Sequence, residues 1–321
     1  MFESLSQIDN VRLNFSEGGL LYMNITLAII MFGVALDIKY DHFKNIINYP
    51  KSAILGVFSQ ILVLPALTFV LVILLNPPPS IAMGMILIAA CPGGNISNFI
   101  SSLAKANVAL SVSLTAISTL GATFITPINF AFWGGMYVQY FEKAKHLNIP
   151  IQIDFLQMAQ TVFILLGIPL ILGMWIGNKF PVITKKYQKK IKTTSIILYM
   201  TFIVGALAAN AKYIPSVIIP LGIVVLLLNF QTLFTGYFVG TVFKVPRADR
   251  RTISIETGIQ NSGLALVLIF NPKLFDANGG MAFMAAWWGI WQMITGLILA
   301  YLLSKISIRE FSWSWVKSKD E

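Results

Sequence analysis

Long apolar runs separated by short loops dominate the chain. A membrane-spanning helix needs about 20 mostly apolar residues. On that criterion we predict nine spans, over residues 18–38, 50–75, 80–104, 107–131, 153–177, 191–211, 214–241, 250–270 and 280–304. Pro65, Pro127, Pro169 and Pro220 lie inside these spans and are expected to kink them. The predicted fold class is therefore an all-α polytopic membrane protein with about nine transmembrane helices.

Two of the predicted spans contain a short polar segment near the middle. Residues 91–98 read CPGGNISN, and residues 256–263 read ETGIQNSG. Backbone breakers and polar side chains at membrane depth are tolerated only where protein or a water-filled cavity surrounds them. A pair of such interrupted helices, one in each half of the chain, is typical of the binding site of a secondary transporter.

Composition supports a membrane protein. The mean hydropathy is +0.76, and charged residues make up 11% of the chain, whereas soluble domains carry about 25%. The single cysteine excludes an internal disulfide. The two histidines, His42 and His146, both fall in predicted loops and offer little to zinc or histidine chemistry. We expect no enzyme, no nucleic-acid partner and no obligate protein partner.

The basic residues predict an orientation. Of the 23 Lys and Arg residues, 18 fall on one side of the predicted spans and 5 on the other. The positive-inside rule then predicts an N-terminus outside and a C-terminus in the cytoplasm, as an integral protein of the cytoplasmic (inner) membrane. Residues 1–17 become an extracytoplasmic segment without signal-peptide character, and residues 305–321 a cytoplasmic tail.

The first polar segment predicts an anion-binding helix end. Pro92 cannot donate an amide and two glycines follow it, so the helix should stop near Cys91 and restart near Asn95. A helix restart offers backbone N–H groups and a positive dipole end, which suit a carboxylate.

Oxygen-bearing side chains follow this restart. Ser97 and Asn98 come directly after it, and Ser111 and Thr115 share a face of the next span because they are four residues apart. These oxygens could ligate a hard cation. The alternative is that the hydroxyls bond back to their own helix carbonyls.

Glu256 is the only acidic residue well inside a predicted span. A charge at the bilayer centre costs on the order of 3 kcal/mol, so this acid is protonated or compensated by a cation. Gln260 follows four residues later on the same expected face, and Gly258 could free the carbonyls of Thr257 and Ile259. Such a set of oxygens suits Na⁺. A neutral buried acid is the alternative.

Other polar residues in the spans allow two interpretations. Gln60, Asn261 and Gln292 could hold helices together, or could face a cavity. Cys91 is expected to behave as a small hydrophobic residue.

Three segments together resemble the bile acid:sodium symporter family, which includes bacterial homologues of the intestinal and hepatic bile acid transporters. They are residues 90–98, 107–115 and 256–264, with Gln60 upstream, and the likeness runs from about residue 20 to residue 304. Members of the family often have ten helices, and this chain resembles the nine-helix arrangement that lacks the first.

The resemblance implies a division of the transporter domain, residues 18–304, into two parts. It implies inverted repeats and a core domain in which two broken helices cross, at about 50–131 and 214–304. A panel domain is implied at about 18–38 and 153–211.

The resemblance also implies two sodium sites and a substrate site. The first sodium site would use Ser97, Asn98, Ser111, Thr115 and Glu256. The second would use Gln60, Glu256, Gln260 and the carbonyls of Thr257 and Ile259. The substrate would lie near Asn95, Asn261 and Gln292. Some relatives have a His-Asn pair where this chain has Gln292 and Met293, which leaves the substrate open.

The resulting hypothesis is a sodium-coupled symporter that imports an organic anion by alternating access, with two Na⁺ per substrate. The anion would be a bile acid or a smaller carboxylate metabolite. One alternative is a metalloid efflux carrier of related fold that uses Cys91. Another is a proton-coupled anion carrier that uses Glu256. No paired-acid, His-Glu or Ser-Lys set supports an intramembrane enzyme.

Overall fold

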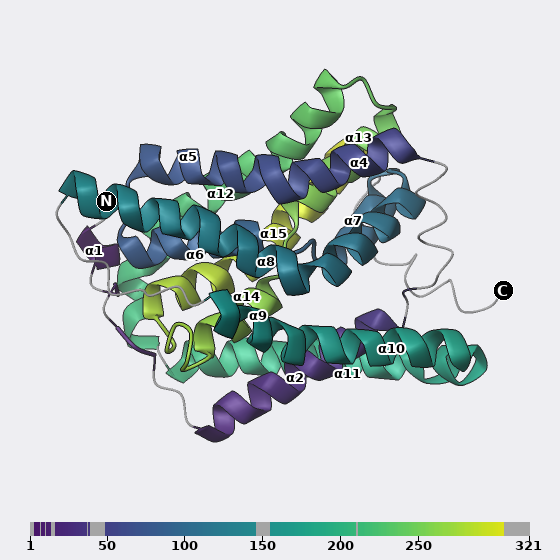
Figure 1. The fold of residues 1–321 in the computed structure, drawn as a ribbon, viewed down its shortest axis with the longest axis horizontal. Coiled ribbons are helices and arrows are strands. Elements are labelled where there is room, and N and C mark those ends of the chain that lie inside the picture. Colours follow the sequence, from purple (N-terminus) through teal and green to yellow (C-terminus); the bar gives the residue numbers. More distant parts are fainter. Residues whose placement is uncertain are drawn as a thin grey trace.

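The structure is a computed structural model that describes residues 3–6, 8–9, 11–13, 17–36, 38, 49–145, 155–209 and 211–304. Within these ranges the chain is helical and forms no β-strand, apart from two isolated bridges (Figure 1). This confirms the all-α prediction for the described residues. The predicted tail at 305–321 and both histidines lie outside them.

The helices follow one another with short connections. The first half of the chain contains α1 (Glu3–Ser6), α2 (Glu17–Ala35), α4 (Pro50–Phe58), the π-helical segment η1 (Ser59–Val63), α5 (Leu64–Leu75), α6 (Pro79–Ala90), α7 (Ile96–Leu103) and α8 (Val108–Lys145). The second half contains α9 (Phe155–Val162), the π-helical segment η2 (Phe163–Gly167), α10 (Ile168–Lys179), α11 (Pro181–Ala209), η3 (Ala211–Tyr213), α12 (Ile214–Val242), α13 (Arg247–Gly258), α14 (Ser262–Phe270) and α15 (Gly279–Ser304).

Five continuous helical segments are long and apolar enough to cross a membrane. They are Pro50–Leu75, Val108–Phe141, Leu156–Lys179, Val217–Val242 and Gly279–Ser304. The protein is therefore polytopic. The remaining predicted spans fall on α2, on α11 and on the two broken pairs α6/α7 and α13/α14. The total of nine spans stays a prediction.

Two helices extend well beyond their predicted spans. α8 continues to Lys145 instead of ending near residue 131, and α11 begins at Pro181 instead of residue 191. The α8 extension is apolar as far as Phe141 and was missed because a span of about 20 residues was assumed, whereas the start of α11 is polar and gives no hydropathy signal. Proline is also well tolerated at the first position of a helix, so Pro181 starts α11 where we expected a loop.

Two of the internal prolines follow a π-helical turn. η1 ends one residue before α5, whose second residue is Pro65, and η2 precedes α10, whose second residue is Pro169. Proline lacks an N–H and its ring crowds the carbonyl four residues before it. A wider π turn accommodates both effects. Pro127 and Pro220 instead lie inside the α-helices α8 and α12.

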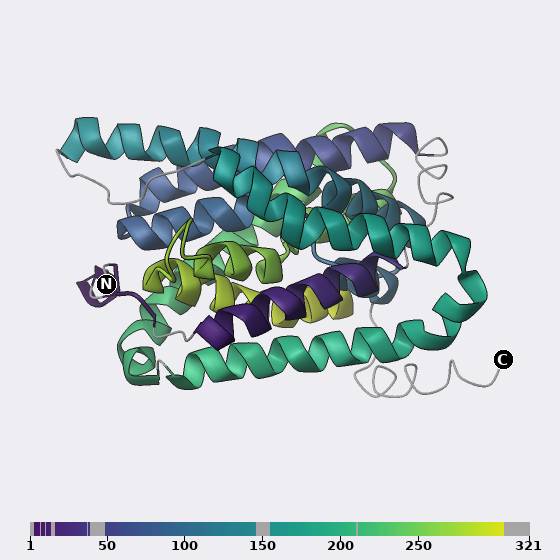
Figure 2. The same cartoon turned by 60° about the horizontal axis from the view of Figure 1, so that its bottom comes forward.

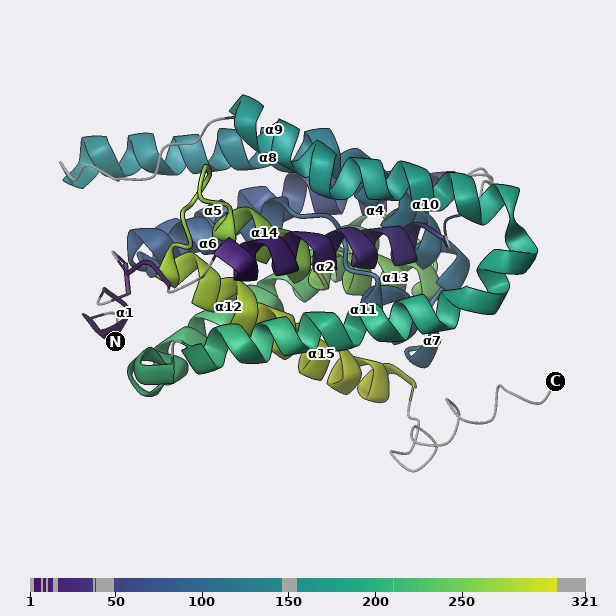
Figure 3. The same ribbon diagram turned by 90° about the horizontal axis from the view of Figure 1, so that it is seen from below.

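The helices form a thick group and a thinner layer beside it. α2 packs between α10 and α11 in the thinner layer (Figures 2 and 3). The broken pairs lie inside the thicker group, where α8 contacts α6 and α7 and α15 contacts α6, α7 and α14. The interrupted helices are thus supported along their length by continuous ones.

The N-terminal segment docks on one end of the thicker group. Leu5 and Ile8 are fully buried, and the backbone of Val11 accepts a hydrogen bond from Gly279 N at 2.8 Å. Asp9 Oδ1 accepts one from Ser80 N at 2.7 Å, near the start of α6. Because α6 starts after Pro78, which offers no side-chain cap, Asp9 supplies the cap from elsewhere in the chain.

We predict that Asp9→Ala lowers the stability of the fold by about 1 kcal/mol, because it removes a cap and a negative charge from a helix N-terminus. Asp9→Asn should retain part of the effect, since its amide oxygen can still accept. Thermal melting of the protein purified in detergent measures this.

Arg12→Ala is the matched control. Arg12 lies three residues away and pairs with Asp276 at 3.4 Å, but both side chains are largely exposed, and such pairs contribute little. An equal loss in Arg12→Ala and Asp9→Ala would contradict the capping role.

Candidate functional site

The two broken helices meet through their backbones. α6 ends at Ala90 and α7 begins at Ile96, whereas α13 ends at Gly258 and α14 begins at Ser262. Gly94 N donates to Ile259 O at 2.8 Å, and Asn261 N donates to Pro92 O at 2.8 Å. Backbone N–H and C=O groups that have no helical partner at one break therefore form hydrogen bonds with groups of the other break. The predicted interruptions are confirmed.

The glycines of the first break allow this close approach. A Cβ atom on Gly94 would lie 3.1 Å from Gln260 O, tighter than ordinary contact. A Cβ atom on Gly93 would lie 2.9 Å from Gln60 Nε2 and 3.0 Å from Glu256 Oε2. Residues with side chains at these two positions would push the crossing helices apart.

Glu256 lies beside this crossing, fully buried, and hydroxyl groups from α7 and α8 surround its carboxylate. Glu256 Oε1 accepts hydrogen bonds from Ser97 Oγ at 2.5 Å, from Ser111 Oγ, and from Thr115 Oγ1 at 3.1 Å. Ser111 and Thr115 therefore lie on one face of α8, as predicted, and both donate hydrogen bonds from that face to Glu256. Among the described residues, no Lys or Arg forms an ion pair with this acid.

The oxygen atoms around Glu256 outnumber the protons that could link them. Thr115 Oγ1 lies 3.1 and 3.0 Å from the two carboxylate oxygens, 3.2 Å from Asn98 Oδ1 and 3.4 Å from Ser97 Oγ. A hydroxyl has only one proton to donate. Carboxylate, amide and hydroxyl oxygens converging in this way are the ligands that a hard cation prefers.

A second group of oxygen atoms lies at the backbone carbonyls of Glu256 and Thr257. Gln60 Nε2 donates to Glu256 O at 2.7 Å, and Gln260 Nε2 donates to Thr257 O at 2.8 Å. The remaining amide oxygens, Gln60 Oε1 and Gln260 Oε1, are buried and have no hydrogen-bond partner among the described residues. Buried acceptors without partners are costly, and a cation would satisfy both.

The expected helical register of Gln260 is wrong. α13 ends at Gly258, and Ile259 is extended, so Gln260 does not lie one helical turn after Glu256. The helix stops there because Ile259 O bonds to Gly94 N. The two carbonyls expected to be free for ligation, of Thr257 and Ile259, both already accept a hydrogen bond.

Two of the predicted substrate residues, Asn95 and Asn261, lie at the breaks, whereas Gln292 lies inside α15 and reaches the second break with its side chain. Asn95 directly precedes α7 and is half-buried. Asn261 caps α14 by accepting from Leu264 N at 3.0 Å. Gln292 accepts from Gln260 N at 2.9 Å and donates to Gln260 O at 3.0 Å. In this conformation Gln292 holds the second break in place.

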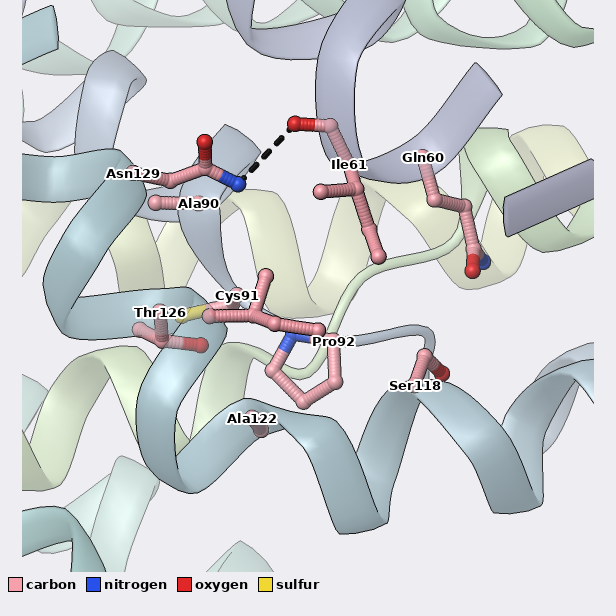
Figure 4. Close-up of a pocket in the computed structure, with 10 residues that line it drawn as sticks. Gln60, Ile61, Ala90, Cys91, Pro92, Ser118, Ala122, Thr126 and Asn129 are labelled. Carbon is pink, nitrogen blue, oxygen red and sulfur yellow. Dashed lines mark hydrogen bonds between the residues drawn. The ribbon is translucent and has the colours of Figure 1, made fainter. Parts of the chain in front are cut away.

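A pocket beside the crossing includes residues that we did not predict. Ser118, Thr126 and Asn129 of α8 line it together with Gln60 and Cys91 (Figure 4). These α8 residues continue the face of Ser111 and Thr115 at helical spacing. That continuation is visible in the sequence as polar residues at helical spacing along residues 111–129.

Comparisons with known proteins identify the family. Residues 24–217, more than half of the chain, match the Sodium Bile acid symporter family. The chain belongs to this family. The family is one of sodium symporters, and the long apolar helices agree with an integral membrane protein.

Several relatives are similar over a longer part of the chain than the family match. The "Uncharacterized sodium-dependent transporter YocS" of Bacillus subtilis (strain 168) is 31% identical over 287 residues, 88% of this chain and 83% of the relative. The "Probable sodium/metabolite cotransporter BASS1, chloroplastic" of Arabidopsis thaliana is 30% identical over 244 residues, 76% of this chain and 58% of the relative. The human "P3 protein" is 29% identical over 259 residues, 80% of this chain but only 52% of its own length.

We predict that Gly93→Ala destabilises the protein, because its new methyl group would displace Gln60 and Glu256. Overpacking of this kind costs about 1–3 kcal/mol. The matched control is Gly135→Ala in α8, where a Cβ atom would meet nothing within 4 Å. Alanine there should preserve or raise the melting temperature, since it favours the helix. Equal effects of the two variants would contradict the close approach at Gly93.

Proposed function

We propose that this protein imports an organic anion together with two sodium ions by alternating access. The observation that carries the proposal is the buried carboxylate of Glu256, which hydroxyl oxygens surround and no basic side chain of the described residues neutralises. A fixed negative charge in such a place calls for a mobile positive one.

The first sodium ion binds among the oxygens of Ser97, Asn98, Ser111, Thr115 and Glu256. The crowding of acceptors around Thr115 Oγ1 supports this assignment, because a cation replaces the missing protons. The residues come from α7, α8 and α13, so one ion ties three helices together.

The second sodium ion binds near Gln60 and Gln260, with Glu256 and the carbonyls of Thr257 and Ile259 close by. The two unpartnered amide oxygens support it. Since both carbonyls already accept hydrogen bonds, they add to the site through their remaining lone pairs.

The anion binds where α7 and α14 begin, near Asn95 and Asn261. Both helix starts lie at the crossing, and helix N-termini favour negative charge. A bile acid or a smaller carboxylate metabolite fits this chemistry. Gln292 contributes by holding the second break, and its side chain reaches the anion only if the Gln260 bonds open.

The transport cycle moves two bodies against each other. α4 to α8 and α12 to α15 form the core, and α2 and α9 to α11 form the panel. With the N-terminus outside, binding of both ions and the anion closes the crossing and allows the core to shift against the panel. The packing of α2 against α10 and α11 supports the panel as one body.

We predict that sodium raises the melting temperature of the purified protein above its value in the same concentration of potassium. A ligand at one hundred times its dissociation constant stabilises the folded state by about 2.7 kcal/mol. Glu256→Gln should abolish the sodium-specific rise, because it removes the charge common to both sites.

Asp276→Asn is the control, since it neutralises an exposed acid at the protein surface. A sodium rise that survives in Glu256→Gln would contradict the assignment. If lower pH replaced sodium as the stabilising condition, the proton-coupled alternative would be favoured.

We predict that uptake of a monovalent anion into proteoliposomes is electrogenic. Two Na⁺ and one such anion carry a net charge of +1 inward, and a potential of 100 mV contributes about 2.3 kcal/mol per charge. Uptake driven by a sodium gradient should therefore rise when the interior is made negative with potassium and valinomycin. A panel of radiolabelled carboxylates identifies the anion, and uptake that is indifferent to voltage would contradict the stoichiometry.

A further inference from the structure

Six lysines gather where α10 passes into α11. They are Lys179, Lys185, Lys186, Lys189, Lys190 and Lys192. The sequence has no Asp or Glu anywhere in residues 155–248, and no ion pair involves these lysines among the described residues. The positive charge of this lysine segment, residues 179–192, is therefore not compensated by the surrounding protein.

The lysines lie at the end of α11 where the helix dipole is also positive. α11 begins at Pro181, so Lys185 and Lys186 belong to its second turn. The N-terminus of a helix carries a positive partial charge and favours anions over cations. Lysines in this place increase the positive potential instead of balancing it, and the segment as a whole attracts anions.

The lengths of the helices place the lysine segment at the membrane surface. The spanning segment Leu156–Lys179 ends at the first of the six lysines. α11 has 29 residues, which is about 43 Å of helix, whereas the hydrocarbon core is about 30 Å thick. The predicted span at 191–211 takes up the hydrocarbon, so residues 181–190 extend beyond it. Their lysines then lie at the depth of the lipid headgroups.

Apolar side chains are exposed between the lysines. Val182 and Ile183 are 82% and 56% exposed, and Lys179 Nζ lies 4.8 Å from the ring centre of the exposed Trp175. A lysine that lays its stem along an apolar surface and keeps its ammonium group outside is typical of a membrane interface. Lysines mixed with exposed apolar and aromatic residues are also typical of segments that bind anionic membrane surfaces.

We propose that the lysine segment binds the headgroups of anionic phospholipids. It lies at one end of the thinner layer, where α10 and α11 extend past the neighbouring end of α2 (Figures 2 and 3). In the orientation that the basic residues predict, the segment faces the cytoplasmic leaflet, whose anionic lipids attract clusters of lysine. Since α10 and α11 belong to the proposed panel, bound lipid would hold the panel in place while the core moves.

The test measures the melting temperature of the purified protein in mixed micelles that contain phosphatidylglycerol or phosphatidylcholine at the same mole fraction. The buffer contains potassium chloride and no sodium, so sodium binding does not contribute. We expect phosphatidylglycerol to raise the melting temperature more than phosphatidylcholine does. Potassium chloride at about 1 M should reduce that difference, because salt screens the attraction. Glycerol phosphate without lipid should give no shift, which distinguishes a lipid headgroup from a free phosphate.

A triple variant removes three exposed lysines of the segment together, by Lys185→Gln, Lys186→Gln and Lys190→Gln. One lysine near an anionic surface strengthens binding about fivefold, so this variant should need at least about tenfold more phosphatidylglycerol for half of the shift. Arginine at the same three positions keeps the charge and should keep the shift. The matched control neutralises three exposed lysines on the same predicted side but outside the segment, by Lys51→Gln, Lys105→Gln and Lys244→Gln.

Equal shifts by the two lipids in the wild type, or an equal loss in the two glutamine triple variants, would overturn the proposal. A shift that glycerol phosphate reproduces would overturn lipid as the partner. If the first triple variant does not fold, the wild type still decides, because a lipid shift that 1 M potassium chloride leaves unchanged would contradict binding by charge. The sodium shift of the proposed function is measured separately, so either result can fail without the other.

Discussion

The arrangement of this protein depends on one buried carboxylate that no basic residue in the described part of the chain neutralises. Glu256 is fully buried, and its hydrogen bonds reach α7 and α8 through Ser97, Ser111 and Thr115. Hydroxyl donors stabilise the negative charge but do not cancel it. In the proposed function a cation joins the helices around Glu256, and ion binding then becomes a condition of their arrangement.

The backbone of the two breaks transmits that condition to the rest of the crossing. Gly94 bonds to Ile259, Asn261 bonds to Pro92, and Gln292 fixes both polar atoms of the Gln260 backbone. None of these contacts involves a charged side chain, so they hold the geometry without adding a second uncompensated charge. Because these hydrogen bonds connect the two breaks, a small movement of Glu256 would also move the starts of α7 and α14.

The sequence predicted the features that local chemistry controls. Pro92 and the glycines after it fixed where α6 stops, and four-residue spacing put Ser111 and Thr115 on one face. It failed where distant contacts decide. Gln260 left its helical register because Ile259 bonds to a residue from the other break, and no local pattern contains that bond. The polar start of α11 was missed because hydropathy detects only apolar segments, and the end of α8 was missed because the expected span length is shorter than this helix.

The separation of ion and anion chemistry explains how coupling can arise without direct contact between them. In the proposed function the ions bind to side chains of α7, α8 and α13, whereas the anion meets the starts of α7 and α14. Helix α7 carries residues of both proposed sites, and the backbone pairing of the breaks joins it to α14. An ion that fixes Glu256 would restrict these helix starts before the anion arrives. The anion would then lose less entropy on binding, so each solute would bind more tightly in the presence of the other. In this proposal coupling is a property of the crossing as a whole, and the face of α8 that carries Ser111 and Thr115 forms its ion side.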